Sequence, residues 1–283
     1  MLKRTFLFLL TVFLLASFSA CGKAPATQPA TQPVETPVTE PITLIENDAL
    51  TLRVLKIEPE AEAGYAVSVM VWNKTDIAFL FVFDDFAVND LLYGEDFQFE
   101  VEGGQKELKR ITLTPDRMEM LGLGKVTKLD FQFYGIRTDT GSDAMSFQND
   151  LSIYPLGEAA YKTHQRTPAQ TDVVLLDNAY CTVTFLGSYA SETDLLCSVF
   201  VTNKTDKELL ILAKDLTLNG VRSDTYAQLS IPAGKQGYDT AFLPMDALRE
   251  INIETIESFA AQVEIYDNAH YSDGPLTTES VSK

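Results

Sequence analysis

The chain has 283 residues, of which 46% are hydrophobic and 10% aromatic, so it has ample material for a buried core and is not a disordered protein. Its 40 acidic residues outnumber its 22 basic residues, which gives a formal net charge of −18. Such a surface repels the phosphates of nucleic acids and the heads of anionic lipids. Nucleic acid is therefore excluded as a partner, and any attachment to a membrane needs a hydrophobic or covalent anchor.

Residues 1–20 have the pattern of an export signal. Lys3 and Arg4 form a charged start, residues 6–15 are apolar, and small residues precede Cys21. The apolar run is shorter than the roughly 20 residues that a membrane-spanning helix needs. We therefore predict a signal peptide over residues 1–20.

The residues around Cys21, Phe-Ser-Ala-Cys followed by Gly22, resemble the lipobox of bacterial lipoproteins. In that family the cysteine is lipidated and becomes the mature N-terminus. The resemblance implies a lipid anchor on Cys21 that holds the protein at the extracellular face of the bacterial cell membrane. Phe18 departs from the family pattern, which usually has Leu or another aliphatic residue at this place. Simple cleavage and release of the protein is the alternative.

Residues 21–42 are predicted to form a disordered linker rich in Pro and Thr. Proline occurs there at every fourth position, at Pro25, Pro29, Pro33, Pro37 and Pro41. This density favours extended polyproline II, in which eighteen residues span on the order of 50 Å. The segment would hold a folded body away from its anchor.

The tetrapeptide Asn-Lys-Thr-Asp occurs twice, at residues 73–76 and 203–206. When residues 67–90 are aligned with residues 197–220 without a gap, ten of 24 positions are identical. Average composition would give roughly one or two identities by chance. The sequence therefore predicts a tandem duplication. We place the first domain at residues 43–160 and the second at 172–270, with a linker at 161–171 and a C-terminal tail at 271–283.

Within each copy the hydrophobic pattern is that of β-strands. Apolar and polar residues alternate over residues 67–72 and 96–101, which is typical of a strand with one buried face. Turn signals recur roughly every 10 to 15 residues, a spacing that favours an antiparallel sandwich. Short helical turns are expected only at residues 114–122 and 243–251. The predicted fold class is all-β, with two antiparallel β-sandwiches.

The alternating valines, the Asn-Lys-Thr-Asp turn, the apolar strand after it and an Asp-x-x-x-Asn pattern resemble the immunoglobulin-like domains of uncharacterised lipoproteins from Gram-positive bacteria. The resemblance covers both copies and implies two tandem immunoglobulin-like domains. More weakly, the turn and its strand are similar to a bacterial proteinase-inhibitor domain of the same sandwich type. Neither resemblance implies a catalytic residue, because the matched positions are structural in both families.

The repeated tetrapeptide is predicted to form a turn between two strands. Asn73, Asp76, Asn203 and Asp206 can accept hydrogen bonds from backbone amides two residues further on. The alternative is that the two equivalent turns present matched binding loops, because loops at the ends of a sandwich often carry recognition.

The sequence contains no recognisable pattern of catalytic or metal-binding residues. The two histidines, His164 and His270, lie outside the strand pattern, and Cys-x-x-Cys and His-x-x-x-His pairs are absent. Carboxylates cluster over residues 84–96, but Asp84 aligns with Lys214 in the second copy, which weakens a shared calcium site. We predict a non-enzymatic protein without a cofactor or a metal.

Cys181 and Cys197 lie in the second copy, and by alternation both side chains point inward. An exported protein meets an oxidising environment, so these two residues are candidates for a disulfide. The alternative is that both thiols act as small hydrophobic groups of the core.

An exposed partner surface is a further candidate. One strand is apolar on both faces, with Phe79, Phe81 and Phe83 on one of them. Both faces must therefore be shielded from water by other parts of the protein or by a partner. A loop or the other domain shields the second face in one interpretation. In the alternative, a partner binds a surface made of Trp72, Phe83 and Phe86.

These features predict a lipid-anchored cell-surface protein that binds or adheres to an envelope protein or glycan. One alternative is a proteinase inhibitor, which needs an exposed rigid loop. Another is an accessory subunit of an envelope transport or secretion complex, which needs a stoichiometric partner.

Overall fold

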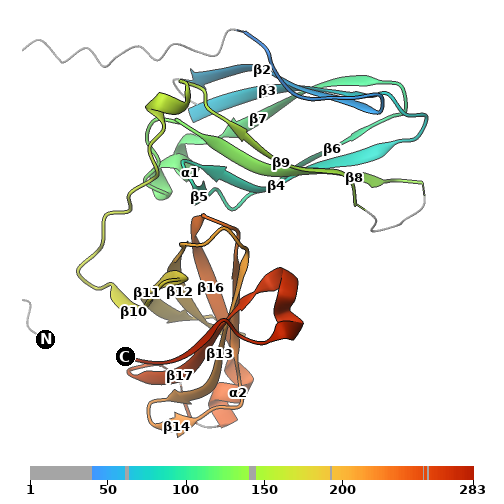
Figure 1. The fold of residues 1–283 in the computed structure, drawn as a ribbon. Helices are drawn as coiled ribbons and strands as arrows, with labels where there is room; N and C mark the ends of the chain where they lie inside the picture. The colour runs from blue at the N-terminus through green and yellow to red at the C-terminus, as the bar shows by residue number, and fades with distance from the viewer. Residues whose placement is uncertain (1–39, 61–63, 140–144, 192, 251, 254) are drawn as a thin grey trace, which may run out of the picture. The chain divides into compact units, whose positions relative to one another are not determined.

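The computed structural model describes residues 40–60, 64–139, 145–191, 193–250, 252–253 and 255–283. The predicted signal peptide, Cys21 and residues 21–39 of the predicted linker lie outside this part. The described residues form an all-β fold of antiparallel sheets with a few short helices, as the sequence predicts (Figure 1). Among them, no helix has the length and apolar character needed to cross a membrane.

The first repeat, residues 42–153, consists of two sheets. In chain order its elements are β1 (Ile42–Glu46), β2 (Leu50–Glu60), β3 (Gly64–Asn73), β4 (Phe79–Val88), β5 (Leu91–Leu92), β6 (Phe97–Val101), β7 (Lys106–Leu113), α1 (Pro115–Met120), β8 (Leu129–Arg137) and β9 (Met145–Ile153). One sheet has the order β1-β2-β3-β7, and the other has β5-β4-β8-β9 with β6 also paired to β4. A short 3-10 helix, η1 (Glu158–Ala160), follows.

The second repeat, residues 173–282, has the same arrangement. Its elements are β10 (Val173–Asp177), β11 (Cys181–Ala190), β12 (Asp194–Asn203), β13 (Leu209–Leu218), β14 (Val221–Arg222), β15 (Ala227–Ile231), β16 (Gln236–Pro244), α2 (Met245–Glu250), β17 (Phe259–Asp267), η2 (Asn268–Asp273) and β18 (Thr277–Ser282). The strand orders are β10-β11-β12-β16 and β14-β13-β17-β18, with β15 paired to β13.

The C-terminal segment is part of this second repeat, so the predicted tail at residues 271–283 is wrong. β18 pairs with β17 from Ala260↔Ser282 to Ile265↔Thr277. Of the β18 side chains only that of Val281 is buried, because the strand lies at the edge of its sheet. A strand with one buried side chain has almost no hydrophobic alternation, which is why the sequence pattern does not reveal it.

The pairing register is the same in both repeats, with an offset of 130 residues, from β3 and β12 to β8 and β17. It differs only at the end of the last strand pair, where β8–β9 has a register shift after Phe133 that β17–β18 lacks. In the first repeat Phe83 pairs with Phe97 and Phe133. In the second repeat Ala213 takes the place of Phe83, and it pairs with Ala227 and Val263. Each side chain of the strands that share this register therefore has a defined structural equivalent in the other repeat.

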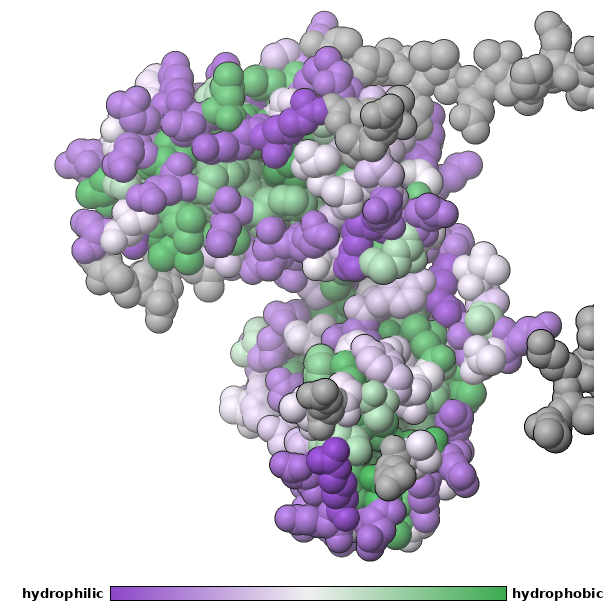
Figure 2. Space-filling view, turned by 180° about the vertical axis from the view of Figure 1, so that it is seen from behind, coloured by the Kyte–Doolittle hydropathy of each residue, from purple (hydrophilic) through white to green (hydrophobic). Residues whose placement is uncertain are grey.

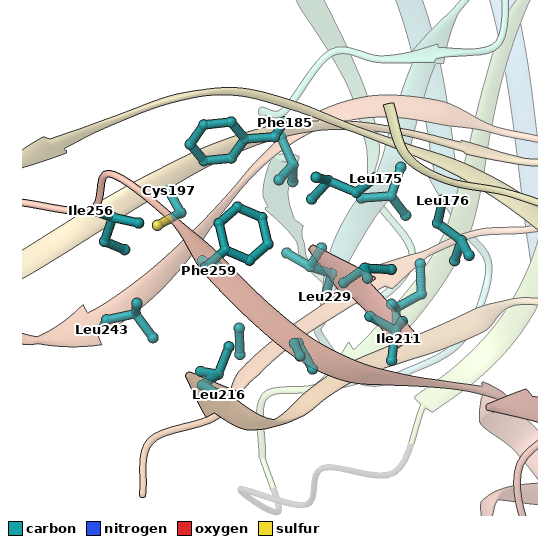
Figure 3. Close-up of a pocket in the computed structure, with 18 of the residues that line it drawn as sticks. Leu175, Leu176, Phe185, Cys197, Ile211, Leu216, Leu229, Leu243, Ile256 and Phe259 are labelled. Carbon is teal, nitrogen blue, oxygen red and sulfur yellow. The ribbon is translucent and has the colours of Figure 1, made fainter. Parts of the chain in front are cut away.

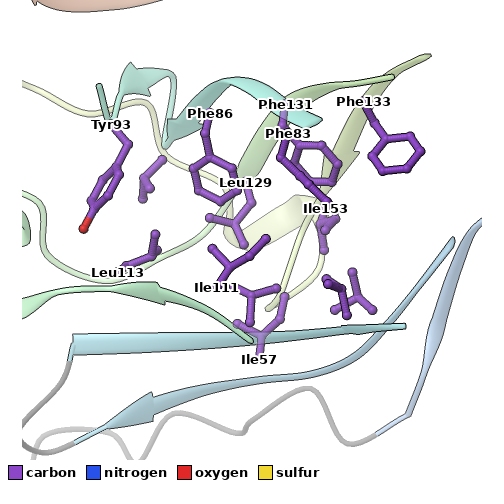
Figure 4. Packing of buried hydrophobic residues seen from close by; sticks show 14 of the residues in the cluster. Ile57, Phe83, Phe86, Tyr93, Ile111, Leu113, Leu129, Phe131, Phe133 and Ile153 are labelled. Atoms are coloured by element: carbon purple, nitrogen blue, oxygen red, sulfur yellow. The ribbon is translucent and has the colours of Figure 1, made fainter. Parts of the chain in front are cut away.

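The core of the first repeat is aromatic (Figure 4). The Phe83 side chain is 0% exposed, and its ring centroid lies 5.0 Å from those of Phe131 and Phe133 and 5.7 Å from that of Phe99. The opposite sheet closes this core with aliphatic residues such as Ile57 and Ile111. Stacked and edge-on rings fill the space between the two sheets.

The repeated tetrapeptide forms the turns after β3 and β12. The Asn73 side chain is 0% exposed, and its Nδ2 donates to the carbonyl oxygens of Ile77 at 2.7 Å and Val101 at 3.0 Å. Its Oδ1 accepts from the backbone nitrogen and the hydroxyl of Thr75 at 3.1 Å and 2.7 Å. Asn203 makes the equivalent bonds in the second repeat. Asparagine thus joins the turn to a strand 28 residues further on, which gives the motif a structural role.

The two repeats belong to one compact unit and contact one another directly. The backbone nitrogen of Gln236 in β16 donates to the carbonyl oxygen of Asp90 at 2.9 Å, next to a single parallel bridge between β16 and β5. Lys128 and Lys235 each lie within 4 Å of the carboxylates of Asp90 and Asp130. These four side chains are at most 15% exposed. Two positive and two negative charges compensate one another, which offsets the cost of burying each.

Candidate functional site

The core of the second repeat contains an apolar cavity with a volume of about 100 Å³ (Figure 3). Its wall comes from both sheets, because β11 and β12 contribute Phe185 and Cys197 while β13, β15 and β17 contribute Ile211, Leu229 and Phe259. The labelled side chains in Figure 3 surround a common space between the sheets. The cavity therefore lies where the first repeat has its aromatic core.

Small side chains at the equivalents of aromatic positions line this cavity. Ala213 stands in the place of Phe83, Ala227 in that of Phe97, and Ala261 in that of Phe131, according to the shared register. Three further positions follow the same rule, since Leu216, Leu229 and Val263 replace Phe86, Phe99 and Phe133. Six phenyl rings are thus exchanged for smaller groups while the backbone pairing is kept. Two rings are gained, because Phe185 and Phe259 stand where the first repeat has Val54 and Leu129, and this does not make up for the six, so space remains between the sheets.

The wall of the cavity offers hydrocarbon surface and one thiol. All lining side chains are those of Leu, Val, Ile, Ala and Phe, apart from Cys197. Cavities of this kind stay dry and accept apolar molecules, because a water molecule inside would find too few hydrogen-bond partners. The chemistry available to this site is binding of apolar groups.

Cys181 and Cys197 are both free thiols, so the candidate disulfide is not formed. Cys197 pairs across the sheet with Ser188, seven residues along β11 from Cys181. This separation along a strand is far beyond the distance of about 7 Å that a disulfide permits between Cα atoms. Both cysteines act as small core residues, which was the alternative prediction, and Cys197 contributes to the cavity wall.

Alkylation of the two cysteines should show a shifted pH dependence. Burial raises the pKa of Cys181 and of Cys197 to about 11, so little thiolate is present at neutral pH. We expect the rate of reaction with iodoacetamide, followed for each cysteine by peptide mass spectrometry, to keep rising up to about pH 11. The protein unfolded in urea is the control, and there the rate should level off near the ordinary thiol pKa. Equal profiles for folded and unfolded protein would contradict the burial of these thiols.

The predicted partner surface of Trp72, Phe83 and Phe86 does not exist as a surface. Phe83 and Phe86 are 0% and 1% exposed and belong to the core of the first repeat. Alternation alone would turn Phe86 away from the core, but β4 has a register shift between Asp84 and Ala87, with Asp85 at a φ of 50°. This bulge rotates Phe86 inward.

Trp72 remains partly exposed in β3. Two lysines contact its ring, with the Nζ atoms of Lys74 and Lys106 at 5.0 Å and 4.0 Å from the ring centroid. These contacts stabilise the ring through cation–π attraction. The indole is therefore part of a small polar surface of the first repeat.

Exposed apolar side chains are concentrated in the second repeat. Seven of the nine large hydrophobic side chains that are exposed in the described part of the chain belong to it: Val174, Tyr189, Val221, Tyr226, Tyr238, Phe242 and Tyr271. Figure 2 shows that hydrophobic residues reach the surface among hydrophilic ones. Tyr189 and Phe242 both oppose Leu196 of β12, so the three form one row across β11, β12 and β16.

The carboxylates over residues 84–96 do not form a metal site with their neighbours. Within the described ranges, no group of three His, Cys, Asp or Glu side chains is close enough to hold a metal ion. Asp84 accepts a hydrogen bond from the hydroxyl of Tyr134 at 3.2 Å, and Asp90 belongs to the ion-pair cluster between the repeats. Asp76 and Asp206 of the repeated tetrapeptide are exposed, so its buried hydrogen bonds come from Asn and Thr.

Neither a scan against protein-family models nor a search of the curated proteins finds a match. The function is therefore inferred from the cavity and from the difference between the two repeats.

Proposed function

We propose that the protein is a non-enzymatic, lipid-anchored binding protein at the extracellular face of the bacterial cell membrane, with recognition in its second repeat. The observation that carries this proposal is the exchange of six aromatic core residues for smaller ones at equivalent positions, which leaves the cavity. The first repeat keeps a filled aromatic core and has a structural role.

Stability alone does not account for this exchange. An unfilled cavity lowers the free energy of unfolding by roughly 24 cal/mol per Å³, so a volume of about 100 Å³ costs the second repeat about 2 kcal/mol. A ligand that binds only the folded state restores stability by mass action. The core of the second repeat has a cavity at positions where the core of the first repeat is filled. The second repeat is therefore better suited to binding a ligand than to a purely structural role.

We further propose that each repeat is an immunoglobulin-like sandwich. The strand pairing supports this, because β3 pairs with β7 in one sheet while β4, β8 and β9 pair in the other. These pairs correspond to the B–E and C–F–G neighbours of the immunoglobulin fold. The second repeat has the same pairs, β12–β16 and β13–β17–β18. In such sandwiches recognition is a property of the individual domain, so two copies can diverge in function.

The anchor is tested by the change Cys21→Ser in bacterial cells that express the full chain. We expect the unchanged protein to sediment with membranes and to dissolve only in detergent, because the lipid on Cys21 holds it there. The variant should lose this membrane association. The control is Cys181→Ser, which leaves the proposed lipidation site intact. Equal fractionation of the unchanged protein and the Cys21→Ser variant would contradict a lipid anchor.

A further inference from the structure

The ligand of the cavity can be narrowed by the chemistry of the wall. Only hydrocarbon groups and the thiol of Cys197 face the space. A hydroxyl, amide or charged group placed there would lose its hydrogen bonds to water without replacement, which costs several kcal/mol. The part of the ligand that enters the cavity must therefore be hydrocarbon.

The volume of the cavity limits the shape of the hydrocarbon group that can enter it. An apolar cavity of about 150 Å³ in another protein accepts one benzene molecule. The cavity of the second repeat, at about 100 Å³, is smaller. A narrow chain of a few carbon atoms fills such a space better than a ring or a fused ring system, because it needs less width.

The wall of the cavity also comes close to the surface. Leu175 of β10, Cys197 of β12 and Phe259 at the start of β17 line it but are only partly buried, as is Ile256. A chain that entered beside Cys197, Ile256 and Phe259 could leave its polar head in water while its end lay among Ile211 and Leu229 (Figure 3). An amphiphile with one alkyl chain meets both conditions.

We infer that the cavity of the second repeat binds the end of an alkyl chain, supplied either by a free fatty acid or by a membrane lipid. This inference rests on the proposed binding role of the second repeat and adds the chemical class of the ligand. The two sources share the alkyl chain and differ in whether the chain must be drawn out of a bilayer.

The test uses octanoate, below the concentration at which it forms micelles, and the full chain. Cys197 lies in the cavity wall, whereas Cys181 is buried elsewhere in the same repeat and serves as an internal control. We expect octanoate to slow alkylation of Cys197 at least tenfold at saturation and to leave Cys181 unchanged. Methyl NMR signals of lining residues such as Ile211 and Leu229 should shift with the same dissociation constant. Equal protection of both cysteines, or of neither, would overturn the inference.

Filling the cavity gives a second test. Ala261→Phe places in the second repeat the side chain that the first repeat has at Phe131, and it should weaken octanoate binding at least tenfold. The matched control is Ala260→Phe, because Ala260 is the neighbouring residue of β17 and is exposed. If Ala261→Phe does not fold, Ala213→Leu fills the same cavity with a smaller group. Unchanged binding in a folded cavity-filling variant would overturn the inference.

The source of the chain is then decided with vesicles of phosphatidylcholine, whose heads carry no net charge and are not repelled by the acidic surface of the protein. If the vesicles protect Cys197 in the unchanged protein but not in Ala261→Phe, the chain comes from a membrane lipid. If only octanoate protects it, the ligand is a free fatty acid. The fractionation of Cys21→Ser tests the lipid anchor and is independent of both results. If this variant loses its membrane attachment while the unchanged protein does not bind octanoate, the ligand class is rejected and the lipid anchor stands.

Discussion

Replacing Phe83 by Ala should lower the free energy of unfolding of the first repeat by about 3 to 5 kcal/mol. The side chain is 0% exposed and contacts the rings of Phe99, Phe131 and Phe133, so the change removes buried surface and leaves a space that these rings cannot close. The chain has a single tryptophan, Trp72, which lies in β3 of the same repeat. Its fluorescence during urea denaturation of the full chain therefore reports the stability of this repeat.

The control for this experiment is Leu108→Ala in β7 of the same repeat. Leu108 is 70% exposed, so its removal should change stability by less than about 0.5 kcal/mol. A loss below about 1 kcal/mol for Phe83→Ala would contradict the aromatic core. A large loss of unfolding free energy instead excludes Phe83 from any partner surface, because replacing an exposed residue of such a surface would leave the stability of the fold nearly unchanged.

Replacing Asn73 by Ala should lower the free energy of unfolding by about 2 to 4 kcal/mol. The amide group is buried and bonds to the carbonyl oxygens of Ile77 and Val101 and to the backbone nitrogen of Thr75, and all three lose this partner. Each buried polar group left without a partner costs about 1 to 3 kcal/mol, although water can reach part of this turn. The measurement is again the urea midpoint followed by Trp72 fluorescence.

Asp76→Ala provides the matched control, because Asp76 is exposed in the same turn. It should change stability by less than about 0.5 kcal/mol. Asn203→Ala should destabilise the second repeat by a similar amount to Asn73→Ala in the first, since the hydrogen bonds of the two residues correspond. This change is followed by far-UV circular dichroism, because Trp72 lies in the first repeat. Equal small effects of Asn73→Ala and Asp76→Ala would mean that the repeated turn is not structural, and would favour matched binding loops.

The strands and short helices of the fold are largely predictable from the sequence. Period-two alternation identifies β3 and β6, and the helices α1 and α2 fall within the segments expected to be helical. Alternation fails at the edge strand β18, where only Val281 is buried. It also fails after the bulge at Asp85, which reverses the side on which Phe86 lies.

The cavity is not predictable from hydrophobic patterns, because a pattern does not distinguish a small apolar residue from a large one. Ala213, Ala227 and Ala261 are far apart in the sequence and meet only when β13, β15 and β17 pair. A signal was nevertheless present. The alignment of the two copies places these alanines opposite Phe83, Phe97 and Phe131, and the difference in volume indicates where the two cores diverge.

The most direct test of a hollow second repeat is the diffraction of crystals of the full chain under xenon pressure, since xenon enters dry apolar cavities and adds strong scattering. We predict a xenon site between Ala213, Ala261 and Cys197, with much lower occupancy among Phe83, Phe131 and Phe133 of the first repeat. Absence of xenon from the second repeat, or equal occupancy in both, would contradict the division of the protein into a filled structural repeat and a hollow binding repeat.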